Sequence, residues 1–326
     1  MARIGINGFG RIGRYLVRLM AERNEFPVVI NARADNASLA HLFKYDSVHH
    51  TFKGTVGHDE NGIIINGTHI AVTRCKPNEW QWKDYGVDLV VESTGTIKKR
   101  AGLAEHMACG AKKVIMSAPV SDADITIVMG VNDGLYDPAK HDVVSSASCT
   151  TNCLAPVAKV LNDTFGIGHG LMTTIHSYTM SQRILDGSQK DIRRARAAMS
   201  MIPTTTGAAK AVALVLPELK GKLDGIAIRV PTPNVSIVDL NCVMKRDVTV
   251  DEVNAALTAA ANDNFGVSDE PLVSIDYNGD THGGVVDLLS TSVMSGNMLK
   301  VLIWYDNEAG FTNQLLRLIT MVGGKM

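Results

Sequence analysis

The first half of the chain alternates short apolar runs with segments of helical period. Ile12, Leu16 and Leu19 recur on one face of such a segment, and residues 98–109 form a second one. Apolar strands separated by helices predict a parallel sheet that is covered on both faces. The strand-like runs are Arg3–Asn7, Pro27–Asn31, Val87–Glu92, Lys113–Ser117, Thr126–Gly130 and Asp142–Ser145.

The second half has longer β-forming runs with fewer helices between them. These runs are Leu171–Thr179, Gly225–Val230, Val235–Val243 and Leu299–Tyr305. They predict an α+β region with a mostly antiparallel sheet and helices on one face. The predicted helices are Gly207–Val215, Val250–Ala261 and Thr312–Val322, and the second of them opens with a Thr249–Glu252 capping box.

Length and composition are those of a globular protein. The chain has 326 residues, enough for two domains, of which 45% are apolar and 20% charged. A net charge of −1 argues against a nucleic acid or a membrane surface as the main partner, and no apolar run is long enough to span a bilayer. The start of the chain lacks a signal-peptide layout, and the five cysteines show neither metal-binding spacing nor a disulfide framework. We therefore expect a cytoplasmic protein without a bound metal.

A glycine motif stands between the first strand and the first helix. Gly8, Gly10 and Gly13 have GxGxxG spacing, which in this position is typical of a Rossmann dinucleotide site. The first glycine permits a tight turn, the second a close approach of the pyrophosphate, and the third close packing of the helix on the strand. The alternative is a glycine-rich turn that binds nothing. The predicted fold class is α/β, with an N-terminal Rossmann dinucleotide-binding domain.

The residue that usually selects NAD is missing after the second strand. An acidic residue there accepts hydrogen bonds from the adenosine ribose, but this chain has Ala32 followed by Arg33. A guanidinium can bind the 2′-phosphate that a carboxylate would repel, which favours NADP. In the alternative interpretation Arg33 is a solvated surface charge and Asp35 reaches the ribose.

Cys149 lies where an apolar strand gives way to a helical pattern. The residues after it, including Cys153, Val157 and Leu161, repeat at helical spacing. Unpaired N–H groups at a helix start favour a thiolate, so Cys149 is a candidate nucleophile. The alternative is an ordinary buried cysteine.

A long charged segment follows the first strand of the second half. Residues 179–201 include Arg183, Lys190, Arg193, Arg194 and Arg196. Together with Thr206 and Gly207 at a helix start and Arg229 on a strand, these arginines could hold phosphate groups. Taken singly, each arginine is more commonly a solvated charge.

Several sequence blocks occur together in one enzyme family. They are Asn7–Arg14, Lys44–Ser47, Glu92–Gly95, Ser146–Pro156, Arg193–Arg196, Pro203–Lys210, Arg229–Asn234 and Trp304–Glu308. In these blocks the chain resembles phosphorylating glyceraldehyde-3-phosphate dehydrogenases from end to end. The resemblance implies an enzyme that oxidises glyceraldehyde 3-phosphate to 1,3-bisphosphoglycerate, consumes inorganic phosphate and passes a hydride to NAD or NADP.

The resemblance also implies a role for each matching residue. Cys149 would be the nucleophile that forms a thiohemiacetal and then a thioester, and His176 would be the base. A neighbouring imidazolium is expected to lower the pKa of Cys149. The residues that match the two anion sites are Ser148, Thr150, Thr179, Arg194, Thr206, Gly207 and Arg229. Those that match the cofactor site are Asn7, Gly8, Gly10, Arg11, Ile12, Arg33, Thr94, Gly95, Ser117, Ser188 and Asn307.

The implied assembly is a homotetramer of two-domain subunits. Residues 1–147 would form the Rossmann cofactor-binding domain, residues 148–306 an α+β catalytic domain, and residues 307–326 a C-terminal helix that returns to the first domain.

The chain departs from the family pattern at two places that bear on the cofactor. Ala32 replaces the usual Asp, and Gly187-Ser188 replaces a Leu-Pro or Gly-Pro pair typical of NAD-dependent members. Both changes favour acceptance of NADP, or a preference for it.

Two other functions stay open. One is an erythrose-4-phosphate dehydrogenase that hydrolyses the thioester, and the other is a non-catalytic, cofactor-binding regulatory protein. The intact positions Arg194, Thr206 and Gly207 favour attack by phosphate over hydrolysis.

Overall fold

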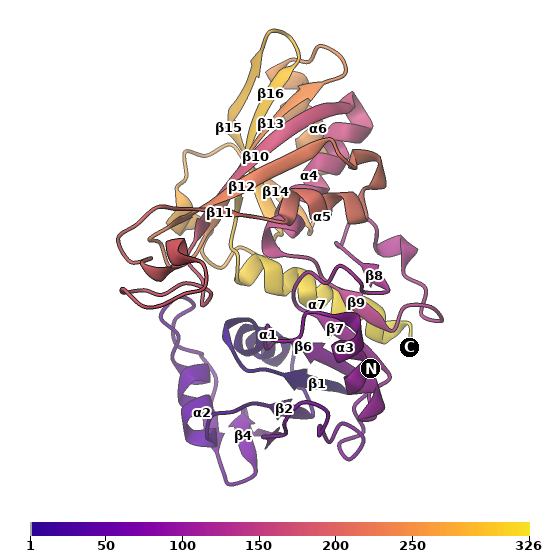
Figure 1. Cartoon of the computed structure of the whole chain (residues 1–326), viewed down its shortest axis with the longest axis vertical. Coiled ribbons are helices and arrows are strands. Elements are labelled where there is room, and N and C mark those ends of the chain that lie inside the picture. Colours follow the sequence, from indigo (N-terminus) through magenta and orange to yellow (C-terminus); the bar gives the residue numbers. More distant parts are fainter. Residues whose placement is uncertain (1) are drawn as a thin grey trace. The chain divides into compact units, whose positions relative to one another are not determined.

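Residues 2–326 are described from a computed structural model, which is drawn in Figure 1. The chain divides into two compact units. The first consists of the residues up to Ile127 together with 133–147 and 315–326, and the second of residues 128–132 and 148–314. Each unit contains one β-sheet.

The first unit is built on a nine-stranded sheet. Its strands are β1 (Ile4–Asn7), β2 (Val29–Asn31), β3 (Val56–His58), β4 (Gly62–Ile65), β5 (Thr68–Thr73), β6 (Leu89–Glu92), β7 (Lys113–Met116), β8 (Ile125–Thr126) and β9 (Val143–Ser145), in the order β3-β4-β5-β2-β1-β6-β7-β9-β8. From β5 to β8 all neighbours are parallel, as predicted. Strands β3, β4 and β5 were not predicted from the sequence, and the β3–β4 and β4–β5 pairs are antiparallel.

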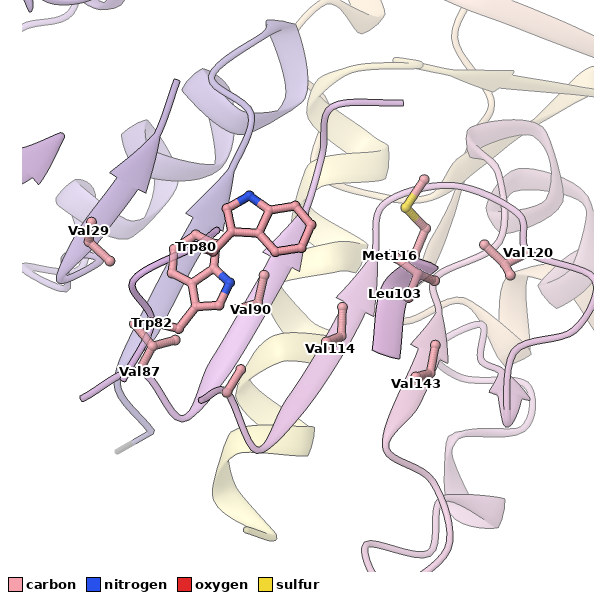
Figure 2. Packing of buried hydrophobic residues seen from close by; sticks show 11 residues of the cluster. Val29, Trp80, Trp82, Val87, Val90, Leu103, Val114, Met116, Val120 and Val143 are labelled. Atoms are coloured by element: carbon pink, nitrogen blue, oxygen red, sulfur yellow. The ribbon is translucent and has the colours of Figure 1, made fainter. Parts of the chain in front are cut away.

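Helices α1 (Arg11–Glu22), α2 (Asn36–Lys44) and α3 (Arg100–Ala108) belong to this unit. Strands β6 and β7 are buried along their whole length, which is why residues 89–91 of β6 and 114–116 of β7 are all apolar. Val90, Val114 and Val143 are register partners on neighbouring strands. Figure 2 shows them side by side, with the indoles of Trp80 and Trp82 against the strand that carries Val90.

The predicted strand at residues 126–130 is wrong beyond Thr126. β8 ends there, and the following apolar residues form a turn in which the Val128 N–H donates to Asn132 Oδ1 at 3.0 Å. Gly130 adopts a φ of 78° in this turn. The run is apolar because it is buried, and burial alone does not distinguish a strand from a buried turn.

The second unit is built on a seven-stranded sheet. Its strands are β10 (Ile167–Ser177), β11 (Ile202–Thr205), β12 (Leu223–Val230), β13 (Ser236–Met244), β14 (Phe265–Ser268), β15 (Gly284–Met294) and β16 (Met298–Tyr305), in the order β11-β12-β10-β13-β16-β15-β14. Only the β10–β12 and β14–β15 pairs are parallel, so the prediction of a mostly antiparallel sheet is confirmed. Buried and partly exposed residues alternate along β13, as expected of a sheet with one covered face.

Helices α4 (Cys149–Phe165), α5 (Ala208–Val215) and α6 (Val250–Ala260) pack against this sheet (Figure 1). The predicted capping box is confirmed at α6. Thr249 Oγ1 accepts from the Glu252 N–H at 3.2 Å, and Glu252 Oε2 accepts from the Thr249 N–H at 2.9 Å. The last helix, α7 (Ala309–Gly324), begins before the predicted Thr312. Its start is stabilised by Asp306, which accepts from the N–H groups of Glu308 and Ala309, both at 2.8 Å.

Within residues 2–326 no helix combines the length and the apolar character needed to cross a bilayer. Nor do His, Cys, Asp and Glu side chains gather anywhere in that range in a group suited to a metal ion.

Candidate functional site

The first unit has a pocket of about 470 Å³ at the carboxyl ends of β1, β2 and β6. Ligands bind parallel sheets at this edge. Its lining includes the predicted cofactor residues Asn7, Gly8, Gly10, Arg33 and Thr94. The predicted residues Arg11, Ile12, Gly95 and Ser117 are not among the side chains and backbone groups that line it.

The glycine turn at this pocket has the geometry that the motif predicts. Gly8 has a φ of 101°, and a Cβ added there would lie 2.7 Å from the Thr94 nitrogen. A Cβ at Gly13 would lie 2.2 Å from the Gly8 carbonyl oxygen, whereas a Cβ at Gly10 would meet no atom within 4 Å. Gly8 and Gly13 are therefore required by the fold, and Gly10 leaves open space where a pyrophosphate could approach the start of α1.

The end of β2 presents no carboxylate to the pocket. Ala32 and Arg33 line it, and no Asp or Glu is among the described residues of its wall. Asp35 instead caps α2, where it accepts from the Ser38 N–H at 2.8 Å and from the Ser38 hydroxyl at 2.7 Å. These hydrogen bonds lower the pKa of Asp35. Both of its oxygens are thus engaged by the helix start, which disfavours the interpretation that Asp35 binds the ribose.

Two of these predicted cofactor residues, Arg11 and Ser117, have other contacts in the first unit. Arg11 donates to both carboxylate oxygens of Asp46, at 2.5 and 3.0 Å. Burial acts to raise the pKa of Asp46, but Arg11 and two backbone N–H groups hold it well below its usual range. Gly95 has a φ of 70°, and the Ser117 N–H donates to the Glu92 carbonyl.

The second unit brings Cys149 and His176 together. Cys149 is the first residue of α4, whose N-cap Ser148 accepts from the Thr151 N–H at 3.0 Å. His176 lies near the end of β10, and its Nε2 is 3.5 Å from Cys149 Sγ. Sequence spacing could not show this contact, because 26 residues of helix and strand separate the two positions.

Arg229 fixes the orientation of the His176 ring. On the neighbouring strand β12 it is the register partner of His176, and its Nη1 donates to the Ser177 carbonyl at 3.0 Å. His176 Nδ1 lies 2.7 Å from the same oxygen and 2.9 Å from Nη1. The carbonyl oxygen accepts only and the guanidinium donates only, so these two neighbours favour opposite tautomers of the ring. The shorter contact, to the Ser177 carbonyl, is satisfied by a proton on Nδ1, which leaves the Nε2 lone pair facing Cys149.

Burial shifts the two pKa values in opposite directions. It raises the pKa of the Cys149 thiol, although the positive charge of Arg229 and hydrogen bonds involving Thr150 act to lower it. Burial, and secondly the charge of Arg229, lowers the pKa of His176 to about 3. The prediction that an imidazolium lowers the pKa of Cys149 is wrong for this structure, because the ring is neutral. The pair is a thiol beside a free base.

The predicted anion-site residues occupy α4, β12, α5 and the segment between β10 and β11. Arg229 and Arg194 are close enough to interact. Burial is the main cause of the lowered pKa of Arg229, and the charge of Arg194 adds to it. Arg194 also donates to Thr204 Oγ1 at 3.0 Å, while Thr206 accepts from the Ala208 N–H at 3.2 Å beside Gly207, the N-cap of α5. Thr179 Oγ1 is hydrogen-bonded to Ser181 at 3.0 Å.

Tyr305 is a site residue that was not predicted from the sequence. Its buried hydroxyl bonds Thr150 Oγ1 at 2.9 Å and Thr174 Oγ1 at 2.7 Å, and its ring meets His176 edge-on. Tyr305 therefore ties the start of α4 to the strand that carries the histidine. Its place in the Trp304–Glu308 block was the only signal in the sequence.

Two family models match the chain. One, described as the glyceraldehyde 3-phosphate dehydrogenase NAD binding domain, covers residues 2–100, and the other, described as the C-terminal domain of the same enzyme, covers residues 148–307. The chain belongs to the glyceraldehyde-3-phosphate dehydrogenase family. It is 58% identical to glyceraldehyde-3-phosphate dehydrogenase 1 of Bacillus cereus, over 100% of this chain and 99% of the relative.

Other curated relatives agree with this assignment. The glyceraldehyde-3-phosphate dehydrogenase of Geobacillus stearothermophilus is 56% identical over 99% of this chain and 98% of its own length. That of Streptomyces coelicolor is 52% identical over 99% of both. The match of the NAD-binding domain makes a nicotinamide dinucleotide the cofactor of the chain, and the pocket beside the open Gly10 suits such a ligand.

Two further positions of the glyceraldehyde-3-phosphate dehydrogenase pattern lie in the second unit. Asn307 is buried, and its Oδ1 accepts from the Ser236 hydroxyl at 2.8 Å, which leaves its amide nitrogen for another partner. Ser188 is exposed, in a segment that folds back on itself through bonds such as Gly187 N–H to the Ala195 carbonyl at 3.2 Å.

Proposed function

We propose that this chain oxidises and phosphorylates glyceraldehyde 3-phosphate, using Cys149 as nucleophile and His176 as base. The observation that carries this proposal is the 3.5 Å approach of Cys149 Sγ to the Nε2 of His176 at the start of α4. A thiol beside a correctly oriented imidazole is the arrangement of an activated nucleophile.

The chain's own residues account for the proton transfers. His176 takes the thiol proton as sulfur attacks the aldehyde carbon, so that a neutral pair gives a thiohemiacetal. The developing oxyanion lies within reach of the backbone N–H groups that open α4. The His176 imidazolium returns its proton to this oxygen, which becomes the hydroxyl of the thiohemiacetal. The ring, neutral again, then removes the hydroxyl proton as the carbon is oxidised to a thioester. When bound, the nicotinamide ring supplies the hydride acceptor for that oxidation.

Two anion sites suit the phosphorylated substrate and the attacking phosphate. Arg229 and Arg194 provide guanidinium groups, and Thr206 and Gly207 open α5 with unpaired N–H groups. Ser148, Thr150 and Thr179 complete the set that we assign to phosphate binding. Attack by phosphate on the thioester releases an acyl phosphate and regenerates Cys149.

A steady-state assay with glyceraldehyde 3-phosphate tests this function. We expect turnover only when inorganic phosphate is present, with an acyl phosphate as product. Turnover at the same rate without phosphate, with release of the free acid, would instead support the hydrolytic reaction of an erythrose-4-phosphate dehydrogenase. No turnover with any nicotinamide dinucleotide would support the regulatory alternative.

We also propose that the enzyme accepts NADP, and that Arg33 binds its 2′-phosphate. Arg33 lines the pocket where the family's Asp is replaced by Ala32. We expect Arg33→Ala to lower kcat/KM for NADP roughly tenfold, the loss of one charged hydrogen-bonding partner, and to leave the value for NAD within about twofold. Ser188→Pro should lower NADP activity in the same direction. Arg23→Ala, on the exposed end of α1, is the control. A wild-type enzyme that strongly favours NAD, or variants that keep full NADP activity, would contradict this proposal.

The assembly and the compartment are part of the same proposal. Exposed apolar side chains gather in the segment between β10 and β11, and such patches commonly contact other subunits. They are Met180, Leu185, Ile192, Met199 and Met201. We propose a cytoplasmic homotetramer in which other copies cover them, with the cofactor domain at residues 1–147, the catalytic domain at 148–306 and a C-terminal segment at 307–326. All five cysteines are free, as a reducing compartment requires. Sedimentation of the intact protein gives its mass and would refute the tetramer if only a monomer formed.

A further inference from the structure

A buried carboxylate lies beneath the dinucleotide pocket, and neither the mechanism nor the predicted site uses it. Glu92 is the last residue of β6 and is 0% exposed. Its Oε2 accepts from Asn7 Nδ2 at 2.5 Å and lies 3.1 Å from His106 Nε2. Its Oε1 accepts from the Thr94 N–H at 2.7 Å and from the Thr94 hydroxyl. Each oxygen therefore has two partners.

Trp82 determines the proton positions on His106. The indole Nε1–H is a donor only, and it points at His106 Nδ1 from 3.0 Å. Nδ1 must accept, so the ring is neutral and its single proton lies on Nε2, facing Glu92. Both rings are buried, with Trp82 1% and His106 0% exposed, so water cannot substitute for either partner. The contact with Glu92 is thus a hydrogen bond from a neutral imidazole.

A second chain of hydrogen bonds reaches Glu92 from the other side. The backbone N–H of Cys75 donates to Asn31 Oδ1 at 2.8 Å, and Asn31 Nδ2 donates to Asn7 Oδ1 at 2.8 Å. Asn7 Nδ2 then donates to Glu92. A backbone N–H cannot accept, so neither asparagine amide can flip without two donors facing each other. Asn31, Asn7 and Glu92 are register partners on β2, β1 and β6.

The two chains of hydrogen bonds start at groups that can only donate, the Trp82 Nε1–H and the Cys75 N–H, and both lead to Glu92. We call Trp82, His106, Glu92, Asn7 and Asn31 the Glu92 network. The group at the centre of this network must accept hydrogen bonds from every partner. A carboxylate can do so, whereas an amide cannot, because its NH₂ group only donates. The hydrogen bonds from His106, Thr94 and Asn7 keep the pKa of Glu92 below its usual value, although burial alone would raise it. A buried anion held entirely by neutral donors is costly unless every one of them is aligned.

We infer that Glu92 is a positioning residue for the dinucleotide, holding Asn7 and Thr94 in the orientation that the pocket needs. Both residues line the pocket, as does Asn31. Thr94 also packs against the glycine turn, because a Cβ at Gly8 would meet its nitrogen at 2.7 Å. Ser93 Oγ donates to the Gly8 carbonyl at 2.8 Å. Glu92 thereby fixes the wall beside the glycine turn, and this inference rests on the proposal that the pocket holds the dinucleotide.

Glu92→Gln tests the inference with a side chain of nearly equal shape. In one orientation the new NH₂ group faces the Thr94 N–H, and in the other it faces Asn7 Nδ2 and His106 Nε2, all of which are donors. We expect the Kd and KM for NAD and NADP to rise roughly tenfold, while kcat and the KM for glyceraldehyde 3-phosphate change less than about twofold. Glu105→Gln, on the same helix as His106, is the matched control and should match the wild type. A folded Glu92→Gln protein that binds both dinucleotides with wild-type Kd overturns the inference.

A second substitution shows whether the weaker binding comes from mismatched hydrogen bonds or from a loss of folding stability. In Trp82→Phe the donor to His106 Nδ1 is lost, so the ring can move its proton to Nδ1 and accept from a glutamine at position 92. This relieves one of the two donor–donor contacts of the glutamine NH₂ group, while the contact with Asn7 Nδ2 remains. The double variant Trp82→Phe/Glu92→Gln should therefore recover part of the lost affinity and bind NAD more tightly than Glu92→Gln alone, although Trp82→Phe removes core volume. If the double variant binds more weakly than Glu92→Gln, the inference fails.

The tautomer of His106 can be measured even if Glu92→Gln does not fold. ¹⁵N chemical shifts of the wild-type protein should show a proton on Nε2 and none on Nδ1. A protonated Nδ1 near pH 7 would overturn the inference. Failure of the proposed function can be distinguished from failure of this inference. If the proposed function is wrong, the wild-type protein binds neither NAD nor NADP, whatever the tautomer of His106.

Discussion

Cys149→Ser should abolish dehydrogenase activity, with kcat lowered by about 10⁴-fold or more. Sulfur is the atom that bonds to the aldehyde carbon, and a serine hydroxyl in the same place is a far weaker nucleophile. The pKa of Cys149 is already raised by burial, and a hydroxyl there would be harder still to ionise. The substitution removes one polarizable atom and leaves the cap of α4 on Ser148 intact. Rates of NADH or NADPH formation at saturating substrate and phosphate measure the effect.

Cys153→Ser is the matched control for this experiment. Cys153 lies on the same helix, one turn further on, but its Sγ is fully buried and contacts the Ile303 carbonyl at 3.8 Å. Burial raises its pKa well above the ordinary value, so it is an inert thiol. The control should keep activity within about threefold of the wild type. Equal activity in Cys149→Ser and Cys153→Ser would refute the proposed mechanism.

His176→Asn should lower kcat about 10²- to 10⁴-fold, the usual contribution of a positioned general base. The pKa of His176 is lowered to about 3, so the ring stays unprotonated and able to accept a proton throughout the neutral range. An asparagine can occupy the space and bond to Ser177, but it cannot take a proton from sulfur. Initial rates at several pH values measure the loss.

The rate at which iodoacetamide alkylates Cys149 measures how far His176 promotes ionisation of the thiol. Because burial raises the pKa of Cys149, its reactivity at pH 7 depends on His176 as proton acceptor. We expect alkylation at pH 7 to slow by roughly tenfold in His176→Asn. The difference should shrink as pH rises, since the thiol then ionises without help. His169→Asn, an exposed histidine on the same strand, is the control. A difference that grows with pH would contradict this account.

The sequence by itself determined those helices, strands, turns and caps whose signals lie within a few residues of one another. Hydrophobic period and glycine spacing predicted the parallel core of the first sheet and the turn at Gly8–Gly13. The Thr249–Glu252 spacing predicted a cap that the structure confirms. Cys149 was placed at a helix start from the pattern that follows it. Each of these signals depends on residues within a few positions of one another, so one chain segment carries all the information needed.

Two short strands at the sheet edges, β3 and β11, were not predicted from the sequence. Their sequences, Val56–His58 and Ile202–Thr205, contain neither an apolar run nor a clear alternation, and they are strands because a neighbouring strand supplies their hydrogen bonds. The apolar run after Thr126 was mistaken for a strand, since burial gives a turn and a strand the same composition.

Only the tertiary structure decided how distant residues act on one another. It placed His176 against Cys149 and Arg229 against His176, and the resulting burial reversed the expected direction of the Cys149 pKa. It also turned Asp35 away to cap α2. The directions of the hydrogen bonds that meet at Glu92 likewise depend on Cys75 and Trp82, which both lie in the segment between β5 and β6. Desolvation and hydrogen-bond direction are properties of an enclosed site, and no single segment encloses one.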